Sequence, residues 1–134
     1  MTPIHDSHAQ RPTLRVLLAE DSLTQQRLTS ALLARQGHAV TVTSNGEEAV
    51  RALEADDFDL ILMDVEMPVM DGLQATSVIR ARERQHGRHT PVIAVTSSAD
   101  AETCLAAGMD AHLAKPLRAH ELDTVLRQMR CRVA

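Results

Sequence analysis

Short apolar runs alternate along the chain with longer segments in which apolar residues recur at helical spacing. Runs rich in Val, Ile and Leu that are bounded by polar or turn residues are typical of buried strands. The run over 60–63 is uninterrupted, so its strand is expected to be buried on both faces. By this criterion the sequence predicts five strands, over 14–19, 39–43, 60–64, 92–96 and 111–114.

Helical spacing fills the segments between these strands. Gly37 supplies a stop for the first helix, and Asn45 and Asp71 are residue types expected as N-caps of the next two. Glu48 follows Asn45 by three residues, a variant of the capping box. The apolar positions that share a helix face are Leu28, Ala31 and Leu32; Ala49, Ala52 and Leu53; Ala75, Val78 and Ile79; and Leu122, Val125, Leu126 and Met129.

Five strands that alternate with five helices require a parallel sheet covered on both faces, because right-handed crossovers place helices on alternate sides where the strand order reverses. We therefore predict an α/β fold of the flavodoxin-like, doubly wound type, with a five-stranded parallel sheet in the order 2-1-3-4-5. The domain is expected over residues 14–130, between a polar tail or linker over 1–13 and a C-terminal tail over 131–134. In such sheets the functional crevice lies at the carboxyl ends of the strands.

Composition and charge limit the class of protein. The chain has 134 residues, 44% of them hydrophobic, which suits one domain with an aliphatic core. A net charge of −4 argues against a nucleic-acid partner, and the basic cluster Arg80, Arg82, Arg84 and Arg88 is expected to be a solvated face at a helix C-terminus. No apolar run approaches the roughly 18 to 20 residues needed to span a bilayer, so we expect no membrane contact and a cytoplasmic location.

Polar side chains of particular kinds stand at the ends of the predicted strands. Glu20 and Asp21 follow the first strand, Asp64 ends the third, Thr96 ends the fourth, and Lys115 follows the fifth. Because the carboxyl ends of parallel strands share one edge of the sheet, these side chains are expected to converge. Three crowded carboxylates repel one another unless a cation holds them, and an all-oxygen cluster suits Mg²⁺.

The other residues at this edge suit a phosphoryl group. Asp64 is the candidate nucleophile, the metal and Lys115 can neutralise phosphoryl oxygens, and Thr96 can donate a hydrogen bond. Lys115 is the single lysine among fourteen Lys and Arg residues. A compact ammonium approaches a phosphoryl oxygen in a narrow crevice better than a planar guanidinium does, which gives the lone lysine a chemical reason.

These residues, together with the stretches MDVEMPVMDG and CLAAGMDAHLAKP, resemble the receiver domain of two-component response regulators over about 14–129, and most closely the receivers of hybrid histidine kinases. The resemblance implies that Asp64 accepts a phosphoryl group from a phosphohistidine of a histidine kinase or a histidine phosphotransfer domain. It also implies a signalling domain that catalyses its own phosphoryl transfer and dephosphorylation, rather than an enzyme with a diffusible substrate.

The resemblance assigns further roles around Asp64. It implies that Asp21 and Asp64 bind Mg²⁺ directly, together with the backbone carbonyl of Glu66. Glu20 is implied to act through water. Thr96 and Lys115 are implied to contact the phosphoryl group. The bond between Lys115 and Pro116 is expected to be cis, a form that only X-Pro bonds adopt at low cost.

Two features depart from the receiver pattern. His112 lies three residues before Lys115, where receivers usually have a Tyr or Phe that acts in a conformational switch with the hydroxyl residue, here Thr96. The segment from Thr96 to Lys115 is about three residues shorter than receivers usually have, which is nearly one helical turn. The fourth helix is therefore expected to be short, covering at most residues 101–107, and weakly fixed.

Other proteins that use an Asp or share this fold fit less well. Phosphatases of the haloacid-dehalogenase type carry their nucleophile after the first strand in a DxDx pattern, where this chain has EDSL. A flavodoxin needs aromatic flanks for its ring, and this chain has one Phe. The alternative is a phosphorylation-independent interaction module, although such a module has no need to keep Asp64, Thr96 and Lys115 together. A monomer is expected, as a stand-alone receiver or as part of a longer kinase.

Overall fold

A computed structural model describes residues 13–97 and 101–133, with side chains up to Met129. Apart from Thr13, the predicted tail over 1–13 lies outside these residues. The strands form one parallel sheet in the predicted order, β2-β1-β3-β4-β5. Their bounds lie within one residue of those predicted: β1 (Arg15–Ala19), β2 (Ala39–Thr43), β3 (Leu60–Asp64), β4 (Val92–Thr96) and β5 (Ala111–Ala114).

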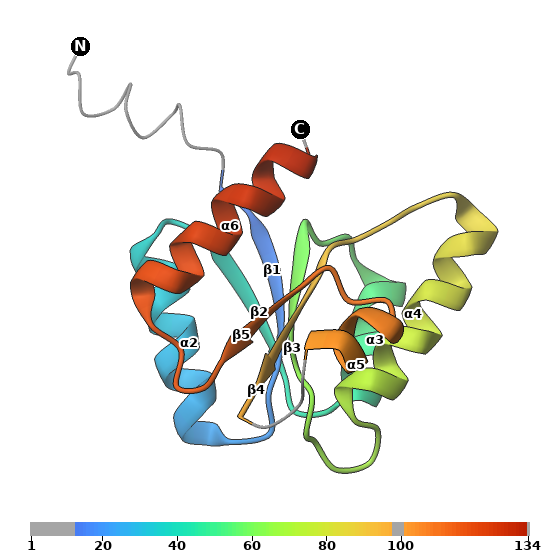
Figure 1. The fold of residues 1–134 in the computed structure, drawn as a ribbon, viewed down its shortest axis with the longest axis horizontal. Helices are drawn as coiled ribbons and strands as arrows, with labels where there is room; N and C mark the ends of the chain where they lie inside the picture. Colours follow the sequence, from blue (N-terminus) through green and yellow to red (C-terminus); the bar gives the residue numbers. More distant parts are fainter. Residues whose placement is uncertain (1–12, 98–100, 134) are drawn as a thin grey trace.

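Helices cover both faces of this sheet. In Figure 1, α2 and α6 lie on one face, and α3, α4 and α5 lie on the other, which confirms the doubly wound arrangement. The last helix continues to Val133, past residue 130, where the domain was expected to end. The helix bounds are α2 (Leu23–Arg35), α3 (Gly46–Ala55), α4 (Gly72–His86), α5 (Ala101–Ala106) and α6 (Ala119–Val133).

The helices that flank the functional edge begin at their predicted caps. The Asn45 side chain accepts a hydrogen bond from Glu48 N at 2.9 Å, and the Glu48 carboxylate accepts one from Ser44 N at 2.8 Å. At the start of α4, Asp71 accepts from Gln74 N while the Gln74 side chain accepts from Asp71 N. These reciprocal bonds satisfy backbone donors that a helix start leaves unpaired.

The core consists of two apolar layers, one on each face of the sheet. β3 is buried at all five positions, as predicted, and α6 buries its predicted apolar stripe. The inward face expected for α2 is wrong by one position, because Thr29 and Leu33 are buried whereas Leu28 is 56% exposed. Thr29 and Leu33 are four residues apart and share a helix face, so a pattern built on aliphatic residues alone missed the threonine.

Arg80 is not part of a solvated face, contrary to the prediction from the basic cluster. Its side chain is 11% exposed and forms ion pairs with Glu83 at 2.6 Å and Asp110 at 2.7 Å. It also donates to the backbone carbonyls of Thr90 and Gly108, at 2.8 and 2.9 Å. The physical reason is that four acceptors from three parts of the chain surround one guanidinium. The three arginines that follow in the cluster are exposed, as predicted.

Candidate functional site

The carboxylates of Glu20, Asp21 and Asp64 meet at the carboxyl edge of the sheet. β1 pairs in parallel register with β3 up to its last residue, so the residues after β1 lie beside the end of β3. One oxygen from each carboxylate lies within 4.8 Å of the others. Glu20 and Asp64 are buried, whereas Asp21 is exposed. The acidic cluster predicted from the strand ends is therefore present.

Lys115, which follows the edge strand β5, also reaches this cluster. Its Nζ lies 3.0 Å from Asp64 Oδ2 and 3.3 Å from Glu20 Oε1. The backbone N of Lys115 donates to Thr96 O at 3.0 Å, which fastens the turn after β5 to the end of β4. Thr96 itself is buried. The ammonium and the hydroxyl are thus delivered by neighbouring strands.

Hydrogen bonds orient the two buried carboxylates and leave one oxygen without a donor. Glu20 Oε2 accepts from Ser22 N at 3.0 Å, and Asp64 Oδ1 accepts from Glu66 N at 3.1 Å. Asp64 Oδ2 is buried and has no hydrogen bond from any described residue, because Lys115 Nζ is close but lies outside the hydrogen-bonding direction. A buried carboxylate oxygen in this state suits a cation ligand.

The electrostatics of the site reflect the crowding of negative charge. Burial is the main reason why the pKa of Glu20 is raised to about 7; the hydrogen bond from Ser22 opposes the rise and the charge of Asp64 adds to it. For Lys115, burial lowers the pKa, but the carboxylates of Asp64 and Glu20 outweigh burial and the pKa is raised. One ammonium therefore lies between two carboxylates.

The residues present fit a divalent cation of the Mg²⁺ type. The three carboxylates offer only oxygen ligands, which Mg²⁺ prefers, and the exposure of Asp21 leaves room for the water molecules that Mg²⁺ keeps. The unbonded Oδ2 of Asp64 and the raised pKa of Glu20 both mark negative charge that the described side chains leave uncompensated. Chemistry and geometry thus agree on a metal-binding set.

Three further predicted features have defined places. The bond between Lys115 and Pro116 is cis, as predicted. Glu66 has an exposed side chain that accepts a hydrogen bond from Ser97 Oγ at 3.2 Å, a link between the ends of β3 and β4 that the sequence did not indicate. His112 lies on β5 with an exposed side chain. Its part in a conformational switch stays a prediction.

The segment between Thr96 and Lys115 contains the short helix that the sequence predicted. α5 has six residues, and Cys104 is the buried one. The helix ends in a tight turn, in which Met109 N donates to Cys104 O at 3.1 Å and Gly108 adopts a φ of +101°. Residues 98–100, between β4 and α5, lie outside the described residues.

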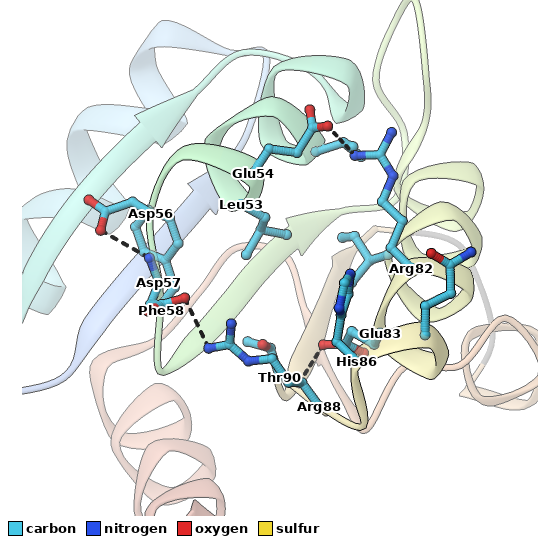
Figure 2. Close-up of a pocket in the computed structure, with 13 residues that line it drawn as sticks. Leu53, Glu54, Asp56, Asp57, Phe58, Arg82, Glu83, His86, Arg88 and Thr90 are labelled. Carbon is cyan, nitrogen blue, oxygen red and sulfur yellow. Dashed lines mark hydrogen bonds and ion pairs between the residues drawn. The ribbon is translucent and has the colours of Figure 1, made fainter.

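A pocket of about 560 Å³ lies at the opposite edge of the sheet, between α3 and α4 (Figure 2). Phe58, just before β3, and Thr90, just before β4, line it, so it adjoins the amino ends of these strands. The exposed ion pair between Glu54 and Arg82 joins α3 to α4 beside it, at 2.7 Å. We assign the chemistry to the acidic cluster, because ligands of doubly wound sheets bind at the carboxyl ends of the strands.

Comparison with known proteins gives one family. The family model described as the response regulator receiver domain matches residues 16–127. The hybrid signal transduction histidine kinase I of Dictyostelium discoideum is 35% identical over 137 residues, which cover 96% of this chain and 8% of that kinase. The chain spans 15% or less of the length of the curated kinases of this kind.

Solved structures agree with this match. The receiver domain of the sensor histidine kinase PA1611 from Pseudomonas aeruginosa, with a magnesium ion coordinated in its active-site cleft, is 41% identical with a TM-score of 0.80, covering 88% of this chain and 98% of that one. A co-crystal structure of the Saccharomyces cerevisiae phosphotransfer protein Ypd1 and the receiver domain of Ssk1 matches at 28% identity and a TM-score of 0.82, covering 90% of each chain. None of the helices described here has the length and apolar character of a membrane span.

Proposed function

The chain belongs to the response regulator receiver domain family, and on that premise we propose that it is a phosphoacceptor domain in which Asp64 takes a phosphoryl group from a phosphohistidine. The observation that carries the proposal is the geometry around Asp64: a buried carboxylate with an ammonium 3.0 Å away and two further carboxylates within 4.8 Å. A nucleophile, a fixed cation and a metal-binding set are the parts that phosphoryl transfer requires.

In the transfer step, a carboxylate oxygen of Asp64 bonds to phosphorus. The bond from phosphorus to the donor imidazole breaks, and its electron pair returns to the ring nitrogen. The N–H of Glu66 holds Oδ1 of Asp64 and so orients the carboxylate for in-line attack. Lys115, beside Oδ2, neutralises charge on the transferred group, and the hydroxyl of Thr96 donates a hydrogen bond to one of its oxygens.

Mg²⁺ is the cofactor of this chemistry. Glu20, Asp21 and Asp64 would hold it together with the backbone carbonyl of Glu66, with Glu20 acting through water. When bound, the ion supplies positive charge that offsets the carboxylates and the phosphoryl oxygens. The magnesium ion in the cleft of the PA1611 receiver supports this assignment.

The phosphoryl donor is a histidine kinase or a histidine phosphotransfer domain, and the chain acts as a receiver of the hybrid-kinase type. The similarity to a hybrid kinase of Dictyostelium and the match to a receiver bound to Ypd1 support this partner class. The domain catalyses its own phosphorylation and the later hydrolysis of the acyl phosphate. The reaction therefore changes the signalling state of the domain and does not serve to produce a metabolite.

Incubation with acetyl phosphate and Mg²⁺, followed by measurement of the intact mass, tests this function. We expect the gain of a single phosphoryl group, which EDTA should prevent. Asp64→Asn removes the nucleophile and should abolish the gain. Asp71→Asn is the matched control, because it makes the same change in the loop after β3 while asparagine can still cap α4.

Two results would count against the proposal. Labelling of Asp64→Asn at the rate of the parent would move the acceptor to another residue. No labelling of the parent chain under conditions that label a known receiver would favour the phosphorylation-independent interaction module.

A further inference from the structure

Val69 occupies a strained position in the loop between β3 and α4. Its φ is +71°, which makes it the one non-glycine residue with a positive φ in the described part of the chain. Met70 N donates to Pro68 O across it at 2.8 Å, so the three residues form a γ-turn of the rare, strained kind. Glycine and asparagine adopt this backbone conformation far more readily than a β-branched residue.

The side chain of Val69 contributes little to the fold. It is 75% exposed, the highest value among the large hydrophobic residues described. Its neighbours anchor the loop instead, because Met67 is buried and Met70 is half-buried. A strained apolar residue with no packing role inside the domain indicates a role toward something outside it.

Two glycines fix the loop in place, so that Val69 is presented in a defined position. A β-carbon at Gly72 would lie 2.3 Å from the carbonyl oxygen of Asp64, which shows how closely the loop returns to the end of β3. On the other side, Gly46 N donates to Met70 O at 2.9 Å, and a β-carbon at Gly46 would lie 2.5 Å from the same oxygen. These close contacts hold the backbone at Met70 and Gly72, where the chain leaves the γ-turn.

The γ-turn lies within reach of a protein that docks over Asp64. The loop projects from the same edge of the sheet as the loop after β1 (Figure 1). Val69 is five positions after Asp64 in the chain, which limits their Cα separation to about 18 Å even for an extended chain. An interface of roughly 800 Å² per partner is about 30 Å across. Asp64 is 1% exposed, so a donor histidine must enter the crevice and bring its own domain against this rim.

We propose that Val69 is a recognition contact for the phosphohistidine-bearing protein that phosphorylates Asp64, and that an apolar surface of this donor packs on the valine. The inference rests on the proposed function and adds a specificity-determining residue to it. The strained turn holds the side chain in one orientation before the donor arrives, so that less conformational entropy is lost on docking. A small phosphodonor reaches Asp64 without touching the tip of the loop.

Two substitutions at Val69 separate side chain from strain. Val69→Asn suits the positive φ and removes the apolar surface. Val69→Thr keeps the branched shape and the strain but replaces one methyl group with a hydroxyl. The small probe is acetyl phosphate, and the protein probe is the phosphorylated histidine kinase or phosphotransfer domain of the source organism that labels the parent chain fastest.

Both variants should react with acetyl phosphate at the rate of the parent. With the protein probe, the concentration needed for half-maximal transfer should rise about five- to tenfold in both, with the maximal rate unchanged. Val69→Asn should also raise the thermal midpoint by a few degrees, because the strain is released. A more stable variant that binds its donor less well excludes misfolding as the cause.

Val42→Thr is the matched control, since it makes the same change at a valine that is 42% exposed on β2 in ordinary strand geometry. It should leave transfer from both probes unchanged. Parental kinetics with the protein probe in both Val69 variants would overturn the proposal and leave phosphorylation of Asp64 standing. An equal loss in Val42→Thr, or an equal loss with acetyl phosphate, would overturn it as well. A parent chain that acetyl phosphate labels but no protein donor labels would remove the contact, whereas one that acetyl phosphate does not label would contradict the proposed function itself.

Discussion

The ammonium of Lys115 lies 3.0 Å from Oδ2 of Asp64 without forming a hydrogen bond to it. The ammonium therefore offsets part of the charge of the carboxylate, while a lone pair on Oδ2 stays free for phosphorus or for a metal. A guanidinium in the same place would present a planar set of N–H donors, which bind carboxylates in pairs. We therefore expect the kind of cation at this position to affect whether Asp64 can act as a nucleophile.

Lys115→Arg should slow the Mg²⁺-dependent labelling of Asp64 by acetyl phosphate at least about tenfold, although the charge is kept. The larger guanidinium would form paired hydrogen bonds to the Asp64 carboxylate and could not approach a phosphoryl oxygen as the ammonium does. Intact mass against time measures the rate. Arg118→Lys, the reverse exchange at a side chain that is 77% exposed, should have no effect. A Lys115→Arg variant that reacts like the parent would refute the argument from the lone lysine.

Glu20→Gln should raise the free energy of unfolding of the metal-free protein by about 1 to 3 kcal/mol at pH 8, because a buried carboxylate whose pKa folding raises is replaced by a neutral amide. Urea denaturation in EDTA measures the change. Added Mg²⁺ should stabilise the parent more than the variant, since the variant has lost one of the carboxylates that would hold the ion and binds it more weakly.

The pH dependence of that gain follows from the pKa of Glu20, which folding raises from 4.5 to about 7. The folded protein binds this proton more tightly than the unfolded chain, so stability falls as the pH rises between these two values. The advantage of Glu20→Gln should therefore be complete above pH 7 and nearly absent at pH 4.5. A gain that stays constant down to pH 4.5 would rule out the carboxylate as its origin.

Arg80→Met should lower the free energy of unfolding by about 3 kcal/mol, because it leaves two largely buried carboxylates, Glu83 and Asp110, without their cation. Arg88→Met is the control: that side chain is 61% exposed, its ion pair with Asp57 is solvated, and a loss below about 0.5 kcal/mol is expected. Urea denaturation of both variants at pH 7 makes the comparison. Similar losses in the two variants would show that the Arg80 network has no special weight.

Amide hydrogen exchange should be fast in α5 of the free protein and slower when beryllofluoride mimics the phosphoryl group. A six-residue helix with one buried residue has few contacts that fix it. In the receiver switch predicted from the sequence, Thr96 moves toward the phosphoryl group and His112 stands in the place of the aromatic residue. Strong protection of residues 101–108 in the free protein, unchanged by beryllofluoride, would contradict a weakly fixed helix.

Much of this fold is readable from the sequence because local pattern and global position agree. The uninterrupted run of β3 predicts burial on both faces, and the caps Asn45 and Asp71 mark where helices begin. The acidic cluster follows from topology, since parallel strands bring their carboxyl ends to one edge. No side-chain geometry is needed to place Asp64 beside Glu20.

The features that sequence reasoning missed depend on contacts between distant residues. The side chain of Arg80 is largely buried because Gly108 and Asp110, far along the chain, supply acceptors for it, and no residue pattern in its helix indicates them. The hydrogen bond from Ser97 to Glu66 depends on side-chain rotamers. The positive φ of Val69 is set by the closing of a loop, and a valine gives no sequence signal for that conformation.

The start of β1 and the end of α6 lie at the same edge of the sheet, the edge opposite Asp64 (Figure 1). A polypeptide joined at either point would be attached at the edge away from Asp64 and would leave the acidic crevice exposed. Rotation about such a tether carries Asp64 over a sphere whose radius the linker length sets. One receiver could thus meet a donor and a downstream acceptor in turn, at a high local concentration and without releasing its attachment.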